Sequence, residues 1–457
     1  MGFQRARPFG RRRRFFHPGH PLAAGGFLPR MIKIYAISLG CPKNRVDTEH
    51  LLGSVGAVTV DCLEDAEVVL INTCGFIQPA VEESLATIFE TAQAIGELET
   101  KPLLAVAGCL VSRYGEELVR QIGEVGLWLS TREIELWPDK LALALGRSIA
   151  ARDERLVSTP PSYAYLKISE GCGHKCAFCA IPSIRGSHVS RAPDDIVREA
   201  AWLIGHGARE LVLVAQDTTA WGRDLADKRD LRHLLERLLA LDGYSWLRLL
   251  YLYPAGLTEE LLGFMRQAGP KLLPYFDIPF QHAHPDILAA MGRPFAQDPR
   301  RVIERVRRHF PEAALRTSLI VGFPGEKPHH FRQLAEFAAE VRFHHLGVFT
   351  YHREDGTRAA TLPGQVGAAV KDRRRAEIME LQARVSEDIL AGYVGSELSV
   401  LVDAPHAEWP GLHVGRAWFQ APEVDGVTYV SGEGVAPGHM VRAVVEEAKT
   451  YDLVALA

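Results

Sequence analysis

Three cysteines within eight residues constrain this chain more than any other feature. Cys172, Cys176 and Cys179 lie in a glycine-containing loop that follows residues 164–169, an apolar run that predicts a strand. Thiolates at this spacing can bind three corners of a four-iron cluster and leave one iron open. Zinc is the alternative metal, but a structural zinc site usually has four ligands, and His174 is awkwardly placed as a fourth. A metal site is therefore favoured over three unrelated buried cysteines.

Three further cysteines, Cys41, Cys74 and Cys109, each follow a predicted strand, and a glycine adjoins each of them. A lone cysteine is usually a small buried apolar residue. In a parallel sheet, however, these three strand ends share one edge, where open α/β folds bind their ligands. The shared position predicts a second three-cysteine site. Cys62 lies outside both sets, and we interpret it as a structural or incidental thiol.

The order of apolar runs and helical patterns predicts three folded regions. Residues 31–150 alternate strands and helices, which is typical of a small α/β domain with a parallel sheet. Residues 158–390 repeat this rhythm over six β/α units and predict a full or partial TIM-like barrel. Residues 391–457 hold short β-rich runs separated by glycine and proline, which indicates a small β-barrel. The expected strands of the central barrel are 164–169, 211–215, 247–252, 275–278, 317–321 and 346–350.

Residues 1–30 carry seven arginines and no acidic residue, without helical or strand periodicity. This segment is a nucleic-acid or targeting arm, a disordered tail, or a mis-assigned start, and we favour the last two. The net charge of −4 without these seven arginines becomes −11, so the rest of the chain is acidic. Hydrophobic residues make up 47% of the chain, which excludes a largely disordered protein. With no apolar run approaching the roughly 18 residues of a membrane span, we expect a cytoplasmic protein.

The two cysteine sets and the C-terminal β-rich region resemble the radical S-adenosylmethionine (SAM) methylthiotransferases, from residue 32 to the C-terminus. Several local motifs are similar to the RimO branch of that family, which modifies an aspartyl residue of ribosomal protein uS12. The MiaB branch, which modifies tRNA, tends to carry different residues around the first two cysteines. The motifs are 38–44 with Asp47, 72–77, 169–172, 185–186, 216–218 and 277–282.

The resemblance implies an N-terminal methylthiotransferase domain, a radical SAM partial (β/α)6 barrel and a TRAM-like C-terminal barrel. It also implies two 4Fe–4S clusters and SAM. The cluster held by the 172–179 loop would bind SAM, and an auxiliary cluster on Cys41, Cys74 and Cys109 would supply or carry the sulfur. One SAM molecule would donate the methyl group, and a second would give the 5′-deoxyadenosyl radical. Flavodoxin or ferredoxin is the expected electron donor, and the sulfur source is not indicated.

The resemblance further suggests residues that contact SAM. Phe178 lies inside the cysteine loop, where radical SAM proteins often place a side chain near the adenine. Gly322 and Glu326 belong to a segment similar to the one that supports the adenosine; the alternative is an ordinary strand-to-helix turn. Gln216 and Asp217 follow the second barrel strand and could face the cofactor. A helix N-cap is an equally good interpretation of Asp217.

Charge is the feature that separates the possible substrates. Residues 393–457 hold nine acidic and three basic residues, a net charge of −6, whereas a tRNA-binding module should be basic. The basic run 371–375 is typical of a solvated helix surface. We therefore expect uS12 as the substrate and do not favour RNA binding. A tRNA adenosine methylthiotransferase and a non-catalytic, metal-binding ribosome-associated protein are the alternatives. His282 is a substrate contact or, more simply, a core histidine.

Overall fold

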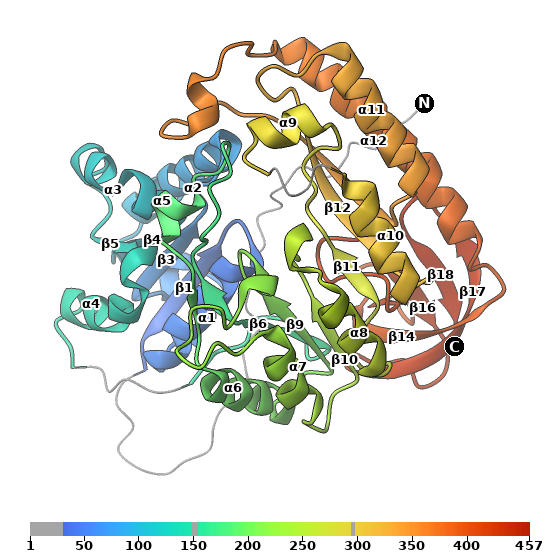
Figure 1. Ribbon diagram of the computed structural model, residues 1–457. Coiled ribbons are helices and arrows are strands. Elements are labelled where there is room, and N and C mark those ends of the chain that lie inside the picture. Colours follow the sequence, from blue (N-terminus) through green and yellow to red (C-terminus); the bar gives the residue numbers. More distant parts are fainter. Residues whose placement is uncertain (1–30, 149–153, 294–297) are drawn as a thin grey trace. The chain divides into compact units, whose positions relative to one another are not determined.

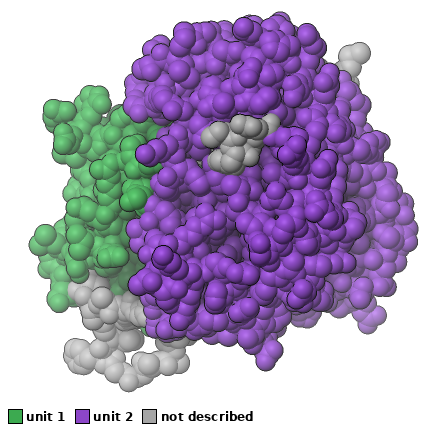
Figure 2. Space-filling view, in the orientation of Figure 1, with its two compact units in different colours: residues 1–158, 180–187 green, residues 159–179, 188–457 purple. Residues whose placement is uncertain are grey.

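The computed structural model describes residues 31–148, 154–293 and 298–457 (Figure 1). The arginine-rich segment 1–30 therefore lies outside the described residues. The chain divides into two compact units, coloured separately in Figure 2. Unit 1 comprises residues 1–158 and 180–187, and unit 2 comprises residues 159–179 and 188–457.

Unit 1 is built on a parallel sheet with the strand order β2-β1-β3-β4-β5, which confirms the predicted α/β class. Its strands are β1 (Lys33–Ser38), β2 (Val58–Thr59), β3 (Val68–Thr73), β4 (Leu103–Gly108) and β5 (Leu127–Ser130). Its helices are α1 (Pro42–Ser54), α2 (Gln78–Gly96), α3 (Cys109–Gln121), α4 (Trp137–Ala144) and α5 (Ile181–Arg185). The central strand β3 is buried along its whole length, as its apolar sequence requires.

Helices cover both faces of this sheet. Leu52 of α1 and Trp137 of α4 pack on one face with Leu70 of β3. Ile88 of α2 packs on the other face with Ile71, the next residue of the same strand. Successive side chains of a strand point to opposite faces, so the continuous apolar run of β3 supplies both cores. The sheet edge at the ends of β1, β3 and β4 is left for the cysteines.

Unit 2 contains the six predicted barrel strands. They are β6 (Tyr163–Lys167), β9 (Glu210–Val214), β10 (Trp246–Leu249), β11 (Tyr275–Asp277), β12 (Ala314–Val321) and β13 (His345–Thr350). They form two parallel sheets, β10-β9-β6 and β11-β12-β13. A backbone hydrogen bond from Leu252 N to Asp277 O, 2.8 Å long, joins the segments that carry β10 and β11. Among the described strands, β6 and β13 each pair with one barrel neighbour, so the barrel is partial.

Helices connect the barrel strands as the β/α rhythm predicts (Figure 1). They are α6 (Pro193–Gly205), α7 (Leu231–Leu239), α8 (Glu259–Gln267), α9 (Pro285–Ala290), α10 (Pro299–His309) and α11 (Pro328–Val341). A short antiparallel pair, β7 (Ser169–Glu170) and β8 (Val189–Ser190), follows β6. The long helix α12 (Ala368–Ala391) leads to the C-terminal region. No helix in the part of the chain that the structure describes is long and apolar enough to cross a membrane.

The C-terminal region of unit 2 is a closed barrel with the strand order β14-β15-β16-β18-β17, as expected from its short β-rich runs. The strands are β14 (Glu397–Pro405), β15 (His413–Arg416), β16 (Thr428–Ser431), β17 (Met440–Ala448) and β18 (Leu453–Leu456). Closure leaves no sheet edge unpaired. Only the last strand, β18, was absent from the sequence-based expectation.

Buried ion pairs join this closed barrel to the central barrel. Glu210 of β9 accepts hydrogen bonds from Arg248 of β10 and Arg416 of β15, each 2.5 Å long. Asp425 accepts from the Tyr275 hydroxyl at 2.6 Å and from Arg316 Nε at 3.2 Å. Part of the predicted negative charge of the C-terminal region therefore lies inside unit 2, paired with the central barrel.

Candidate functional site

Three of the cysteines of unit 1 lie at the carboxyl ends of three neighbouring strands. Cys41 is the N-cap of α1, Cys74 directly follows β3, and Cys109 is the first residue of α3 after β4. Gly40 has a φ of +84°, and a Cβ at this position would lie 2.8 Å from Cys74 Cβ. A glycine is therefore required here for the β1 loop to approach Cys74.

Asn44, on the first turn of α1, lies between two of these thiols. Its Oδ1 is 4.0 Å from Cys41 Sγ and 3.8 Å from Cys109 Sγ. Its Nδ2 donates to the carbonyl oxygens of Leu39 and Thr73, at 3.0 and 2.9 Å. These backbone bonds fix the amide so that its oxygen faces the sulfur atoms.

Arg185 brings a buried positive charge to the same site. Its Nε donates to Cys109 Sγ at 3.3 Å, and its Nη2 donates to Asn44 Oδ1 at 2.6 Å. Nη2 also lies 3.1 Å from Asp47 Oδ2, and the two side chains of this ion pair are 1% and 0% exposed. Because a guanidinium cannot lose its charge in a protein, it stabilises a thiolate or another anion beside it.

The chemistry of this donor set fits a metal cluster. Burial, together with the neighbouring Cys109 and Cys41, raises the pKa of the Cys74 thiol to about 12. Burial also raises the pKa of Cys109, while Arg185 lowers it. Cys74 and Cys109, whose pKa values are raised, stay protonated unless a cation replaces their protons, and metal binding does so. A buried guanidinium beside them favours the net negative charge of a thiolate-ligated iron–sulfur cluster.

The second set lies in unit 2, in the loop after β7. Cys172, Cys176 and Cys179 are half-buried, and the backbone of this loop is held at several points. The Cys179 amide donates to the Cys176 carbonyl oxygen at 3.2 Å. Ala177 N donates to Met291 O, and its own carbonyl oxygen accepts from Ala359 N, both at 2.8 Å. The loop is thus anchored to the segments after α9 and β13.

Arg293 lies close to this second set of cysteines. Burial raises the pKa values of Cys172 and Cys176, and the charge of Arg293 lowers both. Its Nη2 donates to Pro279 O at 2.8 Å, whereas its Nε is buried and has no hydrogen-bond partner among the described residues. A buried donor without a partner is costly, so this Nε fits an anionic group bound at the cysteines.

Two of the predicted SAM contacts lie beside the cysteine loop. Gln216 Nε2 donates to Glu170 Oε1 at 3.1 Å, and its buried Oε1 accepts no hydrogen bond from the described residues. Asp217 is the N-cap of a short 3-10 helix, with Oδ1 accepting from Thr219 N at 2.9 Å. Its Oδ2 lies 2.7 Å from His174 Nε2. The N-cap interpretation of Asp217 is therefore confirmed, and His174 is paired with Asp217. Gln216 keeps an acceptor free for a ligand.

The other predicted contacts are placed as follows. Phe178 packs against the apolar cluster that includes Ala177, Met291 and Phe323. Gly322 N donates to Glu326 Oε2 at 3.0 Å, and Glu326 Oε1 accepts from Arg374. Both carboxylate oxygens of Glu326 thus have protein partners that hold the loop after β12. A direct contact between SAM and any of these three residues stays a prediction.

His282 is fully buried, and its Nδ1 accepts a hydrogen bond from His284 N at 2.9 Å. Its Nε2 lies 3.4 Å from Glu326 Oε2, and burial lowers the pKa of the imidazole. These contacts favour the interpretation of His282 as a core histidine.

Asn44, Asp47, Arg185 and Arg293 were not predicted as site residues from the pattern. The first three lie within motifs quoted for the resemblance. Their separation in sequence, 141 residues between Asn44 and Arg185, leaves no periodicity that indicates a contact. Arg293 follows α9 and carries no local signal. A buried arginine without a predicted acidic partner is the one pattern that could have directed attention to it.

A partial β/α barrel with a three-cysteine loop after its first strand defines a radical SAM enzyme, and this one carries a further cysteine-bearing domain. Family models agree with this class. The Radical SAM superfamily model matches residues 166–338, and the TRAM domain model matches residues 394–457. The model of the uncharacterized protein family UPF0004 matches residues 33–130, which include Cys41, Cys74 and Cys109.

Curated relatives are similar over nearly the whole chain. The ribosomal protein uS12 methylthiotransferase RimO of Nitratidesulfovibrio vulgaris (strain Hildenborough) is 62% identical, over 93% of this chain and 100% of that protein. The proteins of the same name from Oleidesulfovibrio alaskensis and Aquifex aeolicus are 59% and 43% identical. They match 93% and 92% of this chain, and 100% and 96% of their own lengths. The chain belongs to the RimO family of radical SAM methylthiotransferases. As a radical SAM enzyme it uses SAM and a 4Fe–4S cluster.

Solved structures share the fold at low sequence identity. The radical SAM methyltransferase TsrM from Kitasatospora setae, solved with cobalamin and a [4Fe-4S] cluster, has a TM-score of 0.54 and 14% identity. The match covers 85% of this chain and 81% of TsrM. This likeness concerns the fold alone.

Proposed function

We propose that this enzyme transfers a methylthio group to the β-carbon of an aspartyl residue of ribosomal protein uS12. The observation that carries the proposal is the pair of three-cysteine sites, each with a buried arginine beside its thiols. Two separate sites are needed because the reaction breaks an unactivated C–H bond and also inserts sulfur, and side chains alone perform neither step. The curated relatives named uS12 methylthiotransferases support the choice of substrate.

In this proposal each three-cysteine set holds one 4Fe–4S cluster. Cys172, Cys176 and Cys179 hold the cluster that binds SAM, and the unit 1 cysteines hold an auxiliary cluster that carries the sulfur. When bound, these groups supply one-electron reduction of SAM and a sulfur atom for transfer. The chain orients them: Arg185 and Asn44 fix the unit 1 thiols, and the anchored loop fixes the unit 2 thiols.

The same proposal assigns SAM to the surroundings of the 172–179 loop. Gln216 Oε1 is a buried acceptor for a donor group of SAM, such as its ammonium. Phe178, inside the loop, contributes an apolar surface for the adenine. Glu326 and Asp217 act as positioning residues, since their carboxylates hold the Gly322 amide and His174. Flavodoxin or ferredoxin delivers the electron.

The charge of the C-terminal barrel supports a protein substrate. Although part of its acidic residues are buried in ion pairs, its exposed surface is still acidic. The exposed acidic residues include Glu397, Glu408, Glu433, Glu446 and Glu447. Such a surface repels RNA phosphates and attracts a basic ribosomal protein.

A direct competition tests the substrate. The anaerobically reconstituted enzyme is given SAM, a reductant and sulfide, together with purified uS12 and bulk tRNA. We expect mass spectrometry to show one methylthio group on an aspartyl residue of uS12 and none on tRNA adenosines. Cys62→Ala, which alters an exposed thiol outside both sets, should behave as the parent enzyme. Modification of tRNA alone would overturn the proposed substrate.

Cluster stoichiometry is tested separately. Two 4Fe–4S clusters require about eight irons per chain. Cys109→Ala should lower the iron content to about four while Cys176→Ala does the same, because each change disrupts one cluster. A parent protein with about four irons would contradict the assignment of two clusters.

A further inference from the structure

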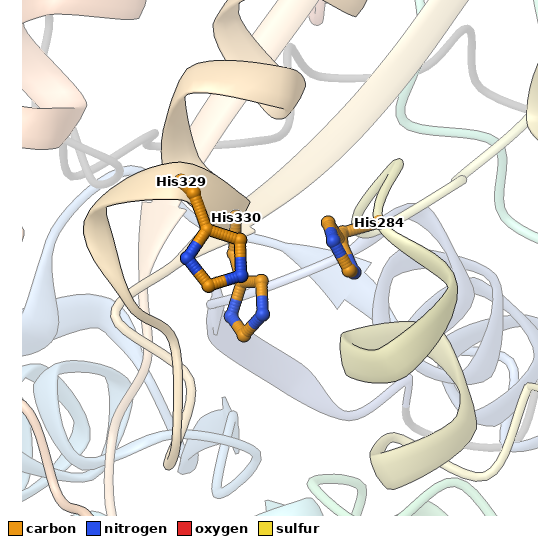
Figure 3. A group of neighbouring side chains, drawn as sticks. All are labelled: His284, His329 and His330. Atoms are coloured by element: carbon orange, nitrogen blue, oxygen red, sulfur yellow. The ribbon is translucent and has the colours of Figure 1, made fainter.

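Three histidines of unit 2 form a compact group outside the cysteine sites. His284 precedes α9 as its N-cap, and His329 and His330 lie in the first turn of α11 (Figure 3). One ring nitrogen from each of the three lies within 4.8 Å of those of the other two. The ring of His330 lies between the others, with centroids 4.2 Å from His284 and 4.0 Å from His329.

We propose that His284, His329 and His330 bind one divalent cation of the borderline class, with Zn²⁺ as the best match. Imidazole nitrogen is a preferred ligand of Zn²⁺, Cu²⁺ and Ni²⁺, and three histidines form a complete set for a zinc ion with one open position. The proposal does not rest on methylthio transfer, because none of these residues touches the cysteine sites in the contacts described above.

The spacing of the nitrogens requires only a small adjustment. Zn–N bonds of about 2.0–2.1 Å place the nitrogens of a tetrahedral site about 3.3 Å apart. The three nitrogens lie within 4.8 Å of one another without an ion, and the exposed His329 ring can turn toward the other two. The buried His330 and the half-buried His284 supply the fixed part of the site.

Hydrogen bonds define which nitrogens are available. His330 Nδ1 accepts from Lys327 N at 3.1 Å, and His284 Nδ1 accepts from Asp286 N at 3.2 Å. Each Nε2 therefore carries the proton in the metal-free protein, and it is the nitrogen that the cap hydrogen bond leaves available. Metal binding at Nε2 moves this proton to Nδ1 and costs one cap hydrogen bond per ring.

Asp286 compensates for that change. Its Oδ2 lies 3.9 Å from His284 Nδ1 and 4.0 Å from His330 Nε2. A carboxylate at this distance can accept the new Nδ1–H of His284, which is the usual outer partner of a metal-bound histidine. Its negative charge also offsets the positive end of the α9 dipole.

The surroundings of His330 favour the neutral form of its imidazole. Burial, with the neighbouring His284 and His329, lowers the pKa of His330 to about 4. A neutral imidazole is the form that ligates a metal.

The test uses full-length protein with its iron–sulfur clusters reconstituted, so that the cysteines are occupied. Loosely bound metal is removed, ZnCl2 is added, and zinc and iron are counted after dialysis. We expect one zinc per chain with the iron content unchanged. Zinc K-edge X-ray absorption should show nitrogen neighbours at about 2.0–2.1 Å and no sulfur shell at about 2.3 Å.

Variants identify the ligands. His329→Ala changes an exposed side chain, so the fold should be kept, and we expect at least a tenfold loss of zinc affinity. His284→Gln should show the same loss. His439→Ala, an exposed histidine of the C-terminal barrel, is the matched control and should bind zinc as the parent does. A sulfur shell, no retained zinc, or unchanged affinity in both variants would overturn the site.

Discussion

Arg185 Nε lies 3.3 Å from the sulfur of Cys109, and the same guanidinium reaches Asn44 and Asp47. One side chain therefore connects the segment 180–187 to a thiol, an amide and a buried carboxylate of unit 1. Arg293 has the corresponding position in unit 2, where its charge lowers the pKa values of Cys172 and Cys176. A permanent cation beside each cysteine set favours thiolate ligation at both sites.

Removing the charge of Arg185 should change the redox properties of the unit 1 site. We expect Arg185→Met to shift the reduction potential of the cluster bound there by on the order of 100 mV to more negative values. A unit charge at about 6 Å and an effective dielectric constant of about 20 contributes about 2–3 kcal/mol. Redox titration followed by EPR spectroscopy measures the shift. Arg120→Met, an exposed arginine of helix α3, which begins at Cys109, is the control, and equal shifts in both variants would contradict a local effect.

The two cysteine sets should fail in different ways. Cys176→Ala should abolish release of 5′-deoxyadenosine from SAM under reducing conditions, because its site binds SAM in the proposal. Cys109→Ala should retain that release and lose methylthio transfer. Chromatography of the nucleoside product and mass spectrometry of uS12 measure the two steps. Loss of both activities in Cys109→Ala, with iron still present in the barrel site, would show that the sets do not divide the work.

The buried Glu210 should be a main determinant of the stability of unit 2. Glu210→Gln removes the carboxylate that pairs with Arg248 and Arg416. The buried Arg248 then loses its carboxylate partner, and Arg416 keeps only Asp403. Breaking such a pair costs about 3–5 kcal/mol. Urea unfolding followed by circular dichroism should show this loss. Glu397→Gln, an exposed acidic residue of β14, is the control and should change stability by less than about 0.5 kcal/mol.

The same carboxylate predicts a pH dependence. Burial opposes ionisation of Glu210, but Arg248 and Arg416 outweigh it and hold its pKa below the ordinary value of 4.5. A lowered pKa in the folded state gives stabilisation that is complete above pH 4.5 and is lost as the pH falls through the lower value. The stability difference between the parent and Glu210→Gln should therefore narrow below about pH 4.5. A difference that stays constant between pH 7 and pH 3.5 would contradict the shifted pKa.

Local sequence patterns were sufficient to predict most of the fold. The apolar runs predicted the six barrel strands because each is a short β-rich segment bounded by polar turns, as in β9. They missed β2, β5 and β18; β2 has only two residues and pairs at a sheet edge. The closed barrel was recognisable from its turns, although β18 pairs with β16 in parallel and only the fold brings them together.

The candidate site divides in the same way. The six cysteines were found because each stands beside a strand end or in a tight motif. Arg185 and Arg293 were not, because their contacts join segments that no periodicity relates. The acidic C-terminal region shows a further limit. The residue types show that Asp425 and Glu423 carry negative charge, but they do not show that Asp425 pairs with Tyr275 and Glu423 with Tyr163. Net charge therefore overstated how much negative surface faces solvent.

The interlocked carboxylates and guanidinium groups of unit 2 also limit how the C-terminal barrel can be exchanged. Across the two barrels, Arg416 pairs with Glu210, and Asp425 pairs with Arg316. A chimera that takes this module from a distant homologue would have to import both halves of each pair, or it would place unmatched ions in a dry interface. The C-terminal barrel therefore depends on the matching residues of the central barrel, and its specificity has to be measured in the full chain.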